Sequence, residues 1–250
     1  MSLVPYVHVA SPLTEAAVGT VVALSEQEHR HLTRVLRLRE GAVVQVADGM
    51  GSSAGGRLMH EAVEVTSDPV SEPVATPEFW VAQALPKGRK LDEVIQQVTE
   101  LGVDGIAPIV AERTIARPAE TKQPRLLERW EGIARSASEQ SRRPRRPHVC
   151  APRPFEALLR DAQDGDRKVA MFLADPSGTP LPRALAELTD QSQIDRLMLI
   201  VGPEGGFTPA ELAAFDAAGG SRVGLGPTVL RTEHAAAAGS AVIQAGLGRW

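Results

Sequence analysis

Beyond residue 77, short apolar runs alternate with segments of helical periodicity, and this alternation constrains the possible folds more than any other feature. Four apolar runs have the length of buried strands: Phe79–Ala84, Val103–Val110, Lys168–Leu173 and Leu197–Val201. After the first run, apolar residues recur at helical spacing before Gly102, namely Leu91, Val94, Ile95, Val98 and Leu101. Strand–helix alternation of this kind predicts an α/β domain with a mostly parallel sheet.

Further helices are expected in the same region. An apolar stripe predicts one helix through Leu126, Leu127, Trp130, Ile133, Ala134 and Ala137. Thr208 and Glu211 form a capping-box pattern with Pro209 at the first helical position, so a helix is expected to begin there. The alanine-rich segment Glu233–Leu247 is expected to form the last helix.

The N-terminal part has a different pattern. We expect a strand at Ala42–Ala47, a hairpin tip at Gly51–Gly56 and a returning strand at Arg57–Thr66. One helix is expected between Ser25 and Leu38, because Ser25 and Glu28 have capping-box spacing and Leu32, Val35 and Leu36 share helical spacing. This pattern favours a small β-barrel-like domain carrying one helix.

The segment from Ser67 to Pro77 contains three prolines and reads as a linker or an extended crossing segment. We therefore predict two domains, residues 1–72 and residues 73–250. The 250-residue chain is 43% hydrophobic and 23% charged, as expected for a soluble globular protein. No apolar run approaches the ~20 residues that span a bilayer, and no signal peptide is evident at the N-terminus, so we expect no membrane association.

Cysteine and histidine usage argues against a metal site. Cys150 is the only cysteine, which excludes an internal disulfide and a multi-cysteine zinc site and fits a reducing cytoplasm. His31, His60 and His148 lack metal-ligand spacing, so no metal is expected. The net charge of −4 argues weakly against a nucleic-acid binder, so any nucleic-acid binding would depend on focused basic patches. Arg142-Arg143-Pro144-Arg145-Arg146 is such a patch, and we expect its arginines to contact phosphates.

Candidate ligand-binding residues lie at three strand ends. The junctions are Phe172–Pro176, Ile200–Thr208 and Val223–Glu233. Ligands of open α/β sheets bind outside the carboxyl ends of strands, where glycines let the backbone approach closely. A phosphate-binding loop is disfavoured, because neither Gly-Lys-Ser/Thr nor G-x-G-x-x-G is present. Tight turns alone would explain one glycine loop, but two such loops with a glutamate and an arginine favour a binding site.

Six motifs in order along nearly the whole chain resemble the RsmE family of 16S ribosomal RNA methyltransferases. They are His31–Arg37, Gln83–Gly88, Gln97–Val103, Glu112–Thr114, Ser138–Arg143, and the pair Val201–Thr208 with Leu225–Glu233. The chain departs from the family pattern twice: Arg89 replaces an acidic residue, and Arg142 replaces a glycine.

The resemblance implies a PUA-like N-terminal β-barrel for RNA binding and a SPOUT domain whose C-terminal trefoil knot binds S-adenosyl-L-methionine. It also implies a cytoplasmic homodimer that methylates N3 of a uridine in 16S rRNA of the small ribosomal subunit. The implied cofactor-binding residues are Leu173, Val201, Gly202, Pro203, Glu204, Gly205, Leu225, Gly226, Leu230, Arg231 and Thr232. The expected RNA-binding residues are His31, Arg34, Arg37, Lys87, Arg89, Arg142 and Arg143.

Methylation of uracil N3 requires its proton to leave, and the resulting charge spreads onto the carbonyl oxygens. Arg231 and Arg113 are candidates for stabilising that charge, and Glu204 or Glu100 for taking the proton. Glu233 could orient Arg231; the two could instead form a surface pair, but the surrounding glycine-containing loop favours the functional interpretation. Arg113 could instead be plain solvated charge, and Glu100 could pair with a nearby basic residue.

Three other functions remain open at this point. A related SPOUT enzyme could act on another RNA position, and a non-catalytic RNA-binding module could retain the fold. An ATP- or dinucleotide-using enzyme is the third, but its lysine or spaced glycines are missing.

Overall fold

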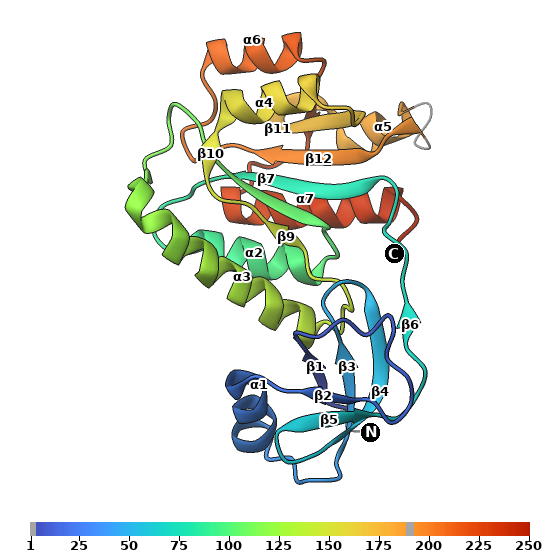
Figure 1. The fold of residues 1–250 in the computed structure, drawn as a ribbon. Helices are drawn as coiled ribbons and strands as arrows, with labels where there is room; N and C mark the ends of the chain where they lie inside the picture. The colour runs from blue at the N-terminus through green and yellow to red at the C-terminus, as the bar shows by residue number, and fades with distance from the viewer. Residues whose placement is uncertain (1–3, 189–192) are drawn as a thin grey trace. The chain divides into compact units, whose positions relative to one another are not determined.

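The computed structural model describes residues 4–188 and 193–250, which form two compact units. The N-terminal unit runs to Val74 and also includes Arg135–Arg146. The C-terminal unit comprises Ala75–Ala134 and Pro147–Trp250. Helix α3 (Gln123–Gln140, green in Figure 1) therefore contributes residues to both. In the described residues, no helix has the length and hydropathy that a bilayer crossing requires.

The N-terminal unit is built on a six-stranded sheet of order β1-β3-β4-β5-β2, in which β6 pairs with β4. The β1–β3 pair is parallel and the other pairs are antiparallel. Its core consists of aliphatic side chains such as Val7, Leu32 and Val46. The elements are β1 (Tyr6–His8), β2 (Val21–Ala23), α1 (Glu26–Arg30), η1 (His31–Val35), β3 (Val43–Ala47), β4 (Ser52–Leu58), β5 (Ala62–Val65) and β6 (Val70–Ser71).

The first strand of the predicted hairpin is present as β3, but the turn after it comes earlier in the chain than expected. Strand β4 starts at Ser52 and pairs with β3, so the stretch Gly51–Gly56 is mostly strand and not a tip. The prediction was wrong because it read glycines as turn residues. A Cβ at Gly56 would collide with a methyl group of Val63, so glycine is needed here for close packing between strands.

The predicted helix after Ser25 is correct at its start and wrong at its end. Ser25 and Glu28 form both hydrogen bonds of a capping box. After Arg30 the helix widens into the π-helical segment η1, and only Leu32 of the predicted apolar face is buried. The π-helical turn changes the side-chain spacing, which leaves Val35 65% exposed.

The C-terminal unit contains a parallel seven-stranded sheet of order β10-β8-β7-β12-β11-β13, in which β9 pairs with β8. Its strands are β7 (Glu78–Ala84), β8 (Gly105–Val110), β9 (His148–Val149), β10 (Arg153–Pro154), β11 (Val169–Pro180), β12 (Arg196–Val201) and β13 (Ser221–Gly224). Its helical elements besides α3 are α2 (Lys90–Glu100), η2 (Glu120–Lys122), α4 (Phe155–Asp164), α5 (Leu181–Ala186), α6 (Pro209–Ala217) and α7 (Thr232–Gly246). The predicted parallel α/β architecture is confirmed.

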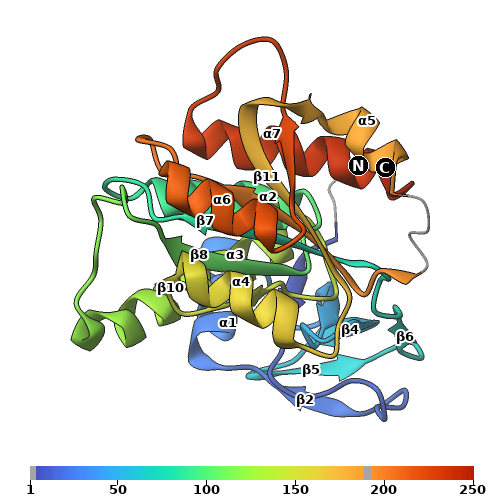
Figure 2. The same ribbon diagram turned by 90° about the horizontal axis from the view of Figure 1, so that it is seen from above.

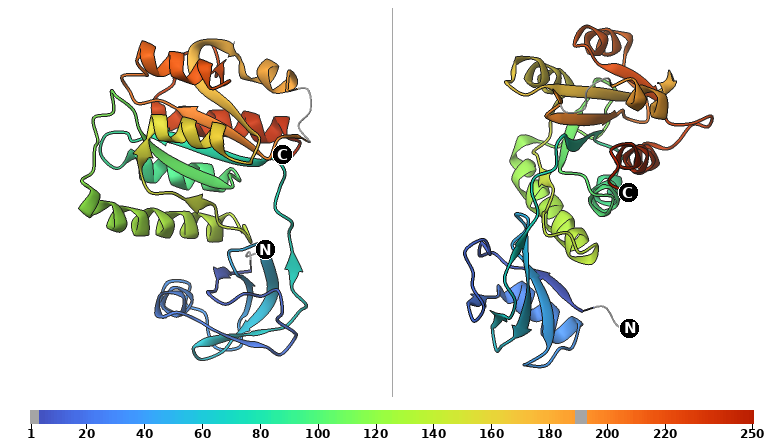
Figure 3. Two further views of the ribbon diagram at one scale, coloured as in Figure 1. Left: turned by 45° about the horizontal axis from the view of Figure 1, so that its top comes forward. Right: turned by 90° about the vertical axis from the view of Figure 1, so that its right-hand side faces the viewer.

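Helices cover both faces of this sheet (Figures 1, 2 and 3). On one face α2, α3, α5 and α7 pack against side chains such as Phe79 and Leu199. On the other face α4 and α6 pack against side chains such as Ile109 and Ile200. The sheet is thus buried on both sides, which explains why its strands read as continuous apolar runs.

The predicted capping box is present after β12, at the start of α6. Thr208 caps α6 and receives a hydrogen bond from the Glu211 amide, while a Glu211 carboxylate oxygen accepts from the Thr208 amide at 2.8 Å. The other Glu211 carboxylate oxygen accepts from the Glu112 amide at 2.7 Å. This contact fixes the segment after β8 beside the loop after β12.

Candidate functional site

A cavity of about 660 Å³ opens between three segments of the C-terminal unit. They are the stretch Leu173–Pro176 of β11, the loop between β12 and α6, and the loop between β13 and α7. All residues predicted to bind the cofactor line it except Gly205: Leu173, Val201, Gly202, Pro203, Glu204, Leu225, Gly226, Leu230, Arg231 and Thr232. The fold therefore brings the predicted cofactor residues to one place.

Hydrogen bonds hold two of these loops together. The Thr232 hydroxyl donates to the Gly202 carbonyl oxygen at 2.7 Å and accepts from Gln83 Nε2 at 2.8 Å. Gln83 is fully buried at the end of β7. It was predicted only as part of a motif and not as a site residue. Its own signal in the sequence is a lone amide side chain at the carboxyl end of an apolar strand.

Glycines shape the loop after β12. A Cβ added at Gly202 would lie 2.9 Å from the Phe207 ring, and Gly206 has a φ of 67°. Gly202 is thus required by close packing, and Gly206 by its left-handed backbone conformation.

Arg231 is the N-cap residue of α7 and lines the cavity with an exposed side chain. Within the described residues, its guanidinium has no hydrogen-bond or ion-pair partner. Glu233 neither orients Arg231 nor forms a surface pair with it, so both interpretations of these two residues are wrong. Glu233 is buried, and its Oε1 accepts from Lys90 Nζ at 2.8 Å. This hydrogen bond lowers the pKa of Glu233 below its usual value.

Lys90 was not among the residues predicted from the sequence. It is the first residue of α2 and lines the cavity, whereas the basic residues predicted beside it, Lys87 and Arg89, are exposed outside the lining. The local sequence does not distinguish Lys90 from Lys87 and Arg89. What distinguishes it is the contact with Glu233, which lies 143 residues away in the chain.

Arg113 lies beside the loop after β12 but does not line the cavity. Its Nη1 donates to the Gly205 carbonyl oxygen at 3.0 Å, and its Cβ lies 3.3 Å from where a Cβ of Gly205 would be. Arg113 therefore supports the loop by contact, and its exposed side chain stays near the cavity-lining residues.

The two candidate proton acceptors are placed differently. Glu204 is exposed in the cavity lining, and its Oε1 lies 3.4 Å from the Lys87 amide. Glu100 ends α2, where its carboxylate accepts from Gln96 Nε2 at 3.0 Å. Lys90 marks the cavity end of this helix, so Glu100 lies roughly 15 Å away along the helix axis. This placement argues against Glu100 as a proton acceptor at the cavity.

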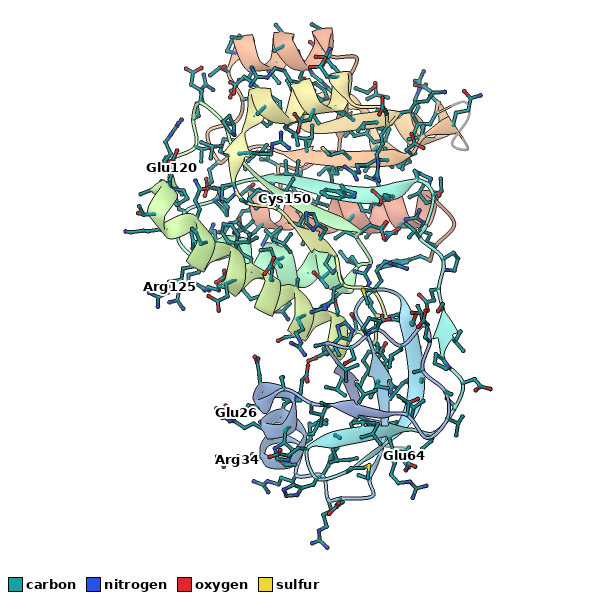
Figure 4. The ribbon with its side chains drawn as sticks, viewed as in Figure 1. Glu26, Arg34, Glu64, Glu120, Arg125 and Cys150 are labelled. Carbon is teal, nitrogen blue, oxygen red and sulfur yellow. The ribbon has the colours of Figure 1, made fainter. Side chains whose placement is uncertain are left out.

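In the N-terminal unit, His31, Arg34 and Arg37 are all exposed within one short segment. Arg34 points outward from η1 in Figure 4. Arg37 has a φ of 55°, a conformation that few non-glycine residues adopt. A π-helical turn followed by a left-handed residue is a local strain of the kind that concentrates at functional sites.

Much of the predicted basic run packs within the N-terminal unit. Arg142 has a φ of 60°, which explains why glycine suits this position, and its guanidinium donates to the Val4 carbonyl oxygen at 2.5 Å. Arg143 is half-buried, and its carbonyl oxygen lies 2.7 Å from His8 Nε2. These two arginines therefore offer only part of their surface to a ligand.

Arg145 and Arg146 are still more engaged. Arg145 donates to the Glu72 carbonyl oxygen at 3.0 Å, and Arg146 is half-buried against Gly49. Burial lowers the pKa of Arg146. We expected all four arginines to contact phosphates. Arg145 and Arg146 have structural roles instead, so phosphate contacts are now expected only from Arg142 and Arg143.

Within the described residues, no group of three or more His, Cys, Asp or Glu side chains could hold a metal ion. Cys150 follows β9 and is half-buried (Figure 4). Burial raises the pKa of its thiol, which favours the protonated form over the nucleophilic thiolate.

Residues 74–244 match the family model of the RNA methyltransferase domain, and residues 24–63 match that of the RNA methyltransferase PUA domain. The chain is 34% identical over 242 residues to the ribosomal RNA small subunit methyltransferase E of Mycobacterium tuberculosis (strain CDC 1551 / Oshkosh), covering 93% of this chain and 89% of the relative. It belongs to the methyltransferase E family.

Other proteins of the methyltransferase E family are also similar to this chain. That of Bacillus subtilis (strain 168) is 31% identical over 221 residues, covering 85% of each chain. The crystal structure of the Neisseria gonorrhoeae methyltransferase E, bound to S-adenosyl methionine, superposes with a TM-score of 0.84 at 26% identity, covering 97% of this chain and 98% of that one. The predicted family and the predicted α/β fold with a PUA-like N-terminal domain are confirmed.

Proposed function

We propose that this protein transfers the methyl group of S-adenosyl-L-methionine to N3 of a uridine in 16S rRNA of the small ribosomal subunit. The observation that carries the proposal is the cavity between three strand ends, lined by the two glycine-containing loops of a methyltransferase E family member. The family supplies the reaction class, and the cavity supplies a site for the methyl donor.

The residues present fit this cofactor. The cavity volume of about 660 Å³ lies within the roughly 300–1,000 Å³ of small-molecule sites. Leu173, Leu225 and Leu230 offer apolar surface for an adenine ring. Glu233 offers a buried carboxylate oxygen, Oε2, that has no hydrogen-bond partner in the described part of the chain. When bound, the cofactor supplies an electrophilic methyl group.

The protein's own groups then act on the uracil. Arg231, with its guanidinium unpaired at the cavity, stabilises the negative charge that develops on a uracil carbonyl oxygen as N3 loses its proton. Arg113 holds the loop that carries Gly205 and provides a second guanidinium nearby. Glu204 is the better-placed carboxylate to accept the N3 proton, since Glu100 lies at the far end of α2.

RNA is held by basic side chains on both units. His31, Arg34 and Arg37 are the freest of these in the N-terminal unit, and Lys87 and Arg89 are exposed in the C-terminal unit. Arg142 and Arg143 contribute with the part of each side chain that is exposed. We assign RNA binding to residues 1–72 as a PUA-like barrel, and catalysis to residues 73–250 as a SPOUT domain with a C-terminal knot. The proposal includes a homodimer acting in the cytoplasm, where ribosomal subunits assemble.

Nucleoside mass spectrometry of 16S rRNA tests the reaction. Cells lacking the gene are expected to lose N3-methyluridine from 16S rRNA, and the purified protein with S-adenosyl-L-methionine is expected to restore it on their small subunits. An Arg231→Lys protein serves as the matched control. Loss of a different methylated nucleoside would instead identify an enzyme acting on another RNA position.

A non-catalytic RNA-binding module is the alternative from another class. Calorimetry separates the two, because a methyltransferase is expected to bind S-adenosylhomocysteine and not ATP. If this protein binds RNA but neither S-adenosylhomocysteine nor ATP, the proposed reaction is contradicted.

A further inference from the structure

The Lys90–Glu233 ion pair forms part of the cavity wall. Lys90 begins α2, Glu233 lies in the first turn of α7, and both residues line the cavity. Their side chains are 37% and 7% exposed, respectively. The ammonium thus remains accessible from the cavity, whereas the carboxylate is almost completely enclosed.

The pair leaves one oxygen unused. Glu233 Oε1 accepts from Lys90, but Oε2 is buried and has no hydrogen-bond partner among the residues that the structure describes. A buried carboxylate oxygen without a donor is costly, so it indicates a donor that arrives with a ligand.

The other carboxylates at the cavity differ from Glu233. Asp175 Oδ1 accepts from the amide and hydroxyl of Ser177, and Asp175 Oδ2 faces Arg222 at 3.8 Å. Glu204 is exposed, so water can satisfy it. Glu233 is therefore the carboxylate that has both an adjacent cation and a free, enclosed oxygen.

We infer that the Lys90–Glu233 pair binds the α-amino-acid end of the cofactor, with the cofactor carboxylate on Lys90 Nζ and its ammonium donating to Glu233 Oε2. This assignment rests on the proposed function. A cation and an anion side by side match a zwitterion, whose two charges are also adjacent.

The ribose of the cofactor is the competing occupant, because carboxylates commonly accept from ribose hydroxyls. A neutral diol needs no ammonium beside the carboxylate, however, and Lys90 would then contribute nothing. The leucines of the lining suit the adenosine, which leaves the charged pair for the charged end of the molecule.

Two ligands separate these occupants. S-adenosylhomocysteine carries the amino-acid end, whereas 5′-methylthioadenosine keeps the adenosine and lacks that end. In calorimetry, Lys90→Met and Glu233→Gln are each expected to weaken S-adenosylhomocysteine binding by about 10- to 100-fold, the effect expected for one charge-assisted hydrogen bond. Binding of 5′-methylthioadenosine is expected to stay unchanged. Lys122→Met, an exposed lysine outside the cavity, is the matched control and should leave both ligands unaffected.

The double variant Lys90→Met/Glu233→Gln guards against misfolding, because it leaves no unpaired buried charge. It is expected to keep the wild-type affinity for 5′-methylthioadenosine and to lose S-adenosylhomocysteine. An equal loss of both ligands, in a variant that melts at the wild-type temperature, would overturn the assignment and favour the ribose or the loops. If the wild-type protein binds neither ligand, the proposed function itself fails, and the inference with it.

Discussion

The hydroxyl of Thr232 donates a 2.7 Å hydrogen bond to the carbonyl oxygen of Gly202, which joins the start of α7 to the loop after β12. The oxygen of the same hydroxyl accepts from the buried amide of Gln83. One side chain thus connects the end of β7, the β12 loop and α7, so the shape of the cavity depends on it.

Replacing this hydroxyl should disturb both stability and binding. Thr232→Val removes the donor to Gly202 and the acceptor for Gln83, so the free energy of unfolding is expected to fall by about 1–3 kcal/mol. Affinity for S-adenosylhomocysteine should fall as well. Thr232→Ser keeps the hydroxyl and is the control. Urea denaturation and calorimetry measure the two effects, and a valine variant equal to wild type in both would show that the contact is dispensable.

Gly202 should not tolerate even one added methyl group. In Gly202→Ala the new Cβ meets the Phe207 ring at 2.9 Å, so the loop must shift and cofactor affinity should drop. The matched control is Gly132→Ala, where a Cβ meets nothing within 4 Å on helix α3. There the helix preference of alanine is expected to preserve or slightly raise stability. Equal affinities of the two variants would remove Gly202 from the cofactor site.

Arg231→Lys tests transition-state stabilisation. Lysine keeps the charge but not the planar multi-donor geometry of a guanidinium. We expect the single-turnover methylation rate to fall on the order of 10²–10³-fold, as for removal of one oxyanion donor. RNA affinity, measured by filter binding, should change little. A wild-type rate would shift the catalytic role to Arg113 or to backbone groups of the two loops.

The strained segment of the N-terminal unit should bind RNA phosphates. Neutralising Arg34 or Arg37 to Gln is expected to weaken RNA binding and to flatten its log–log salt dependence by about 0.7–0.9 for each phosphate that is no longer neutralised. Arg57→Gln, an exposed arginine on β4, makes the same charge change elsewhere on this unit. If all three variants share the wild-type slope, the segment does not bind the RNA backbone.

His8 should make the protein sensitive to acid. Burial lowers the pKa of His8 from 6.5 to about 4, so the folded state holds this imidazole neutral while the unfolded chain can protonate it. The free energy of unfolding is therefore unaffected by this group above pH 6.5. It falls as the pH drops from 6.5 toward 4, because the unfolded chain binds a proton that folded His8 does not. Between pH 7.5 and pH 5 the loss should be roughly 2 kcal/mol. Urea denaturation of His8→Gln should show a flatter pH profile than wild type. His60→Gln, an exposed histidine, should not.

The sequence predicted those features that depend on local pattern. The capping boxes at Ser25 and Thr208 formed as expected, and so did the amphipathic helix α2, because neighbouring residues determine them. The two glycine-containing loops that line the cavity were singled out because both follow apolar strands and together contain a glutamate and an arginine. The misread hairpin tip shows the limit, since glycine at Gly56 serves a strand partner that local sequence cannot reveal.

What the sequence could not supply were contacts made across the chain. The Lys90–Glu233 pair, the position of Gln83 and the packing of residues 135–146 with the N-terminal unit all depend on tertiary structure. Arg135 illustrates this, because it forms an ion pair with Glu28, 107 residues earlier in the chain. Charge pattern alone would place such an arginine on a solvated helix face.

The central position of β12 has a consequence for synthesis on the ribosome. Strand β7 pairs with β8 on one edge and with β12 on the other, and its Glu78 contacts Arg196, 118 residues later in the chain. At typical translation rates β7 waits roughly ten seconds with the backbone N–H and C=O groups of one edge unpaired, a state prone to aggregation. Nascent chains that stop before Val201 should therefore aggregate or recruit chaperones, and the cavity between the strand ends is completed only when α7 has left the exit tunnel.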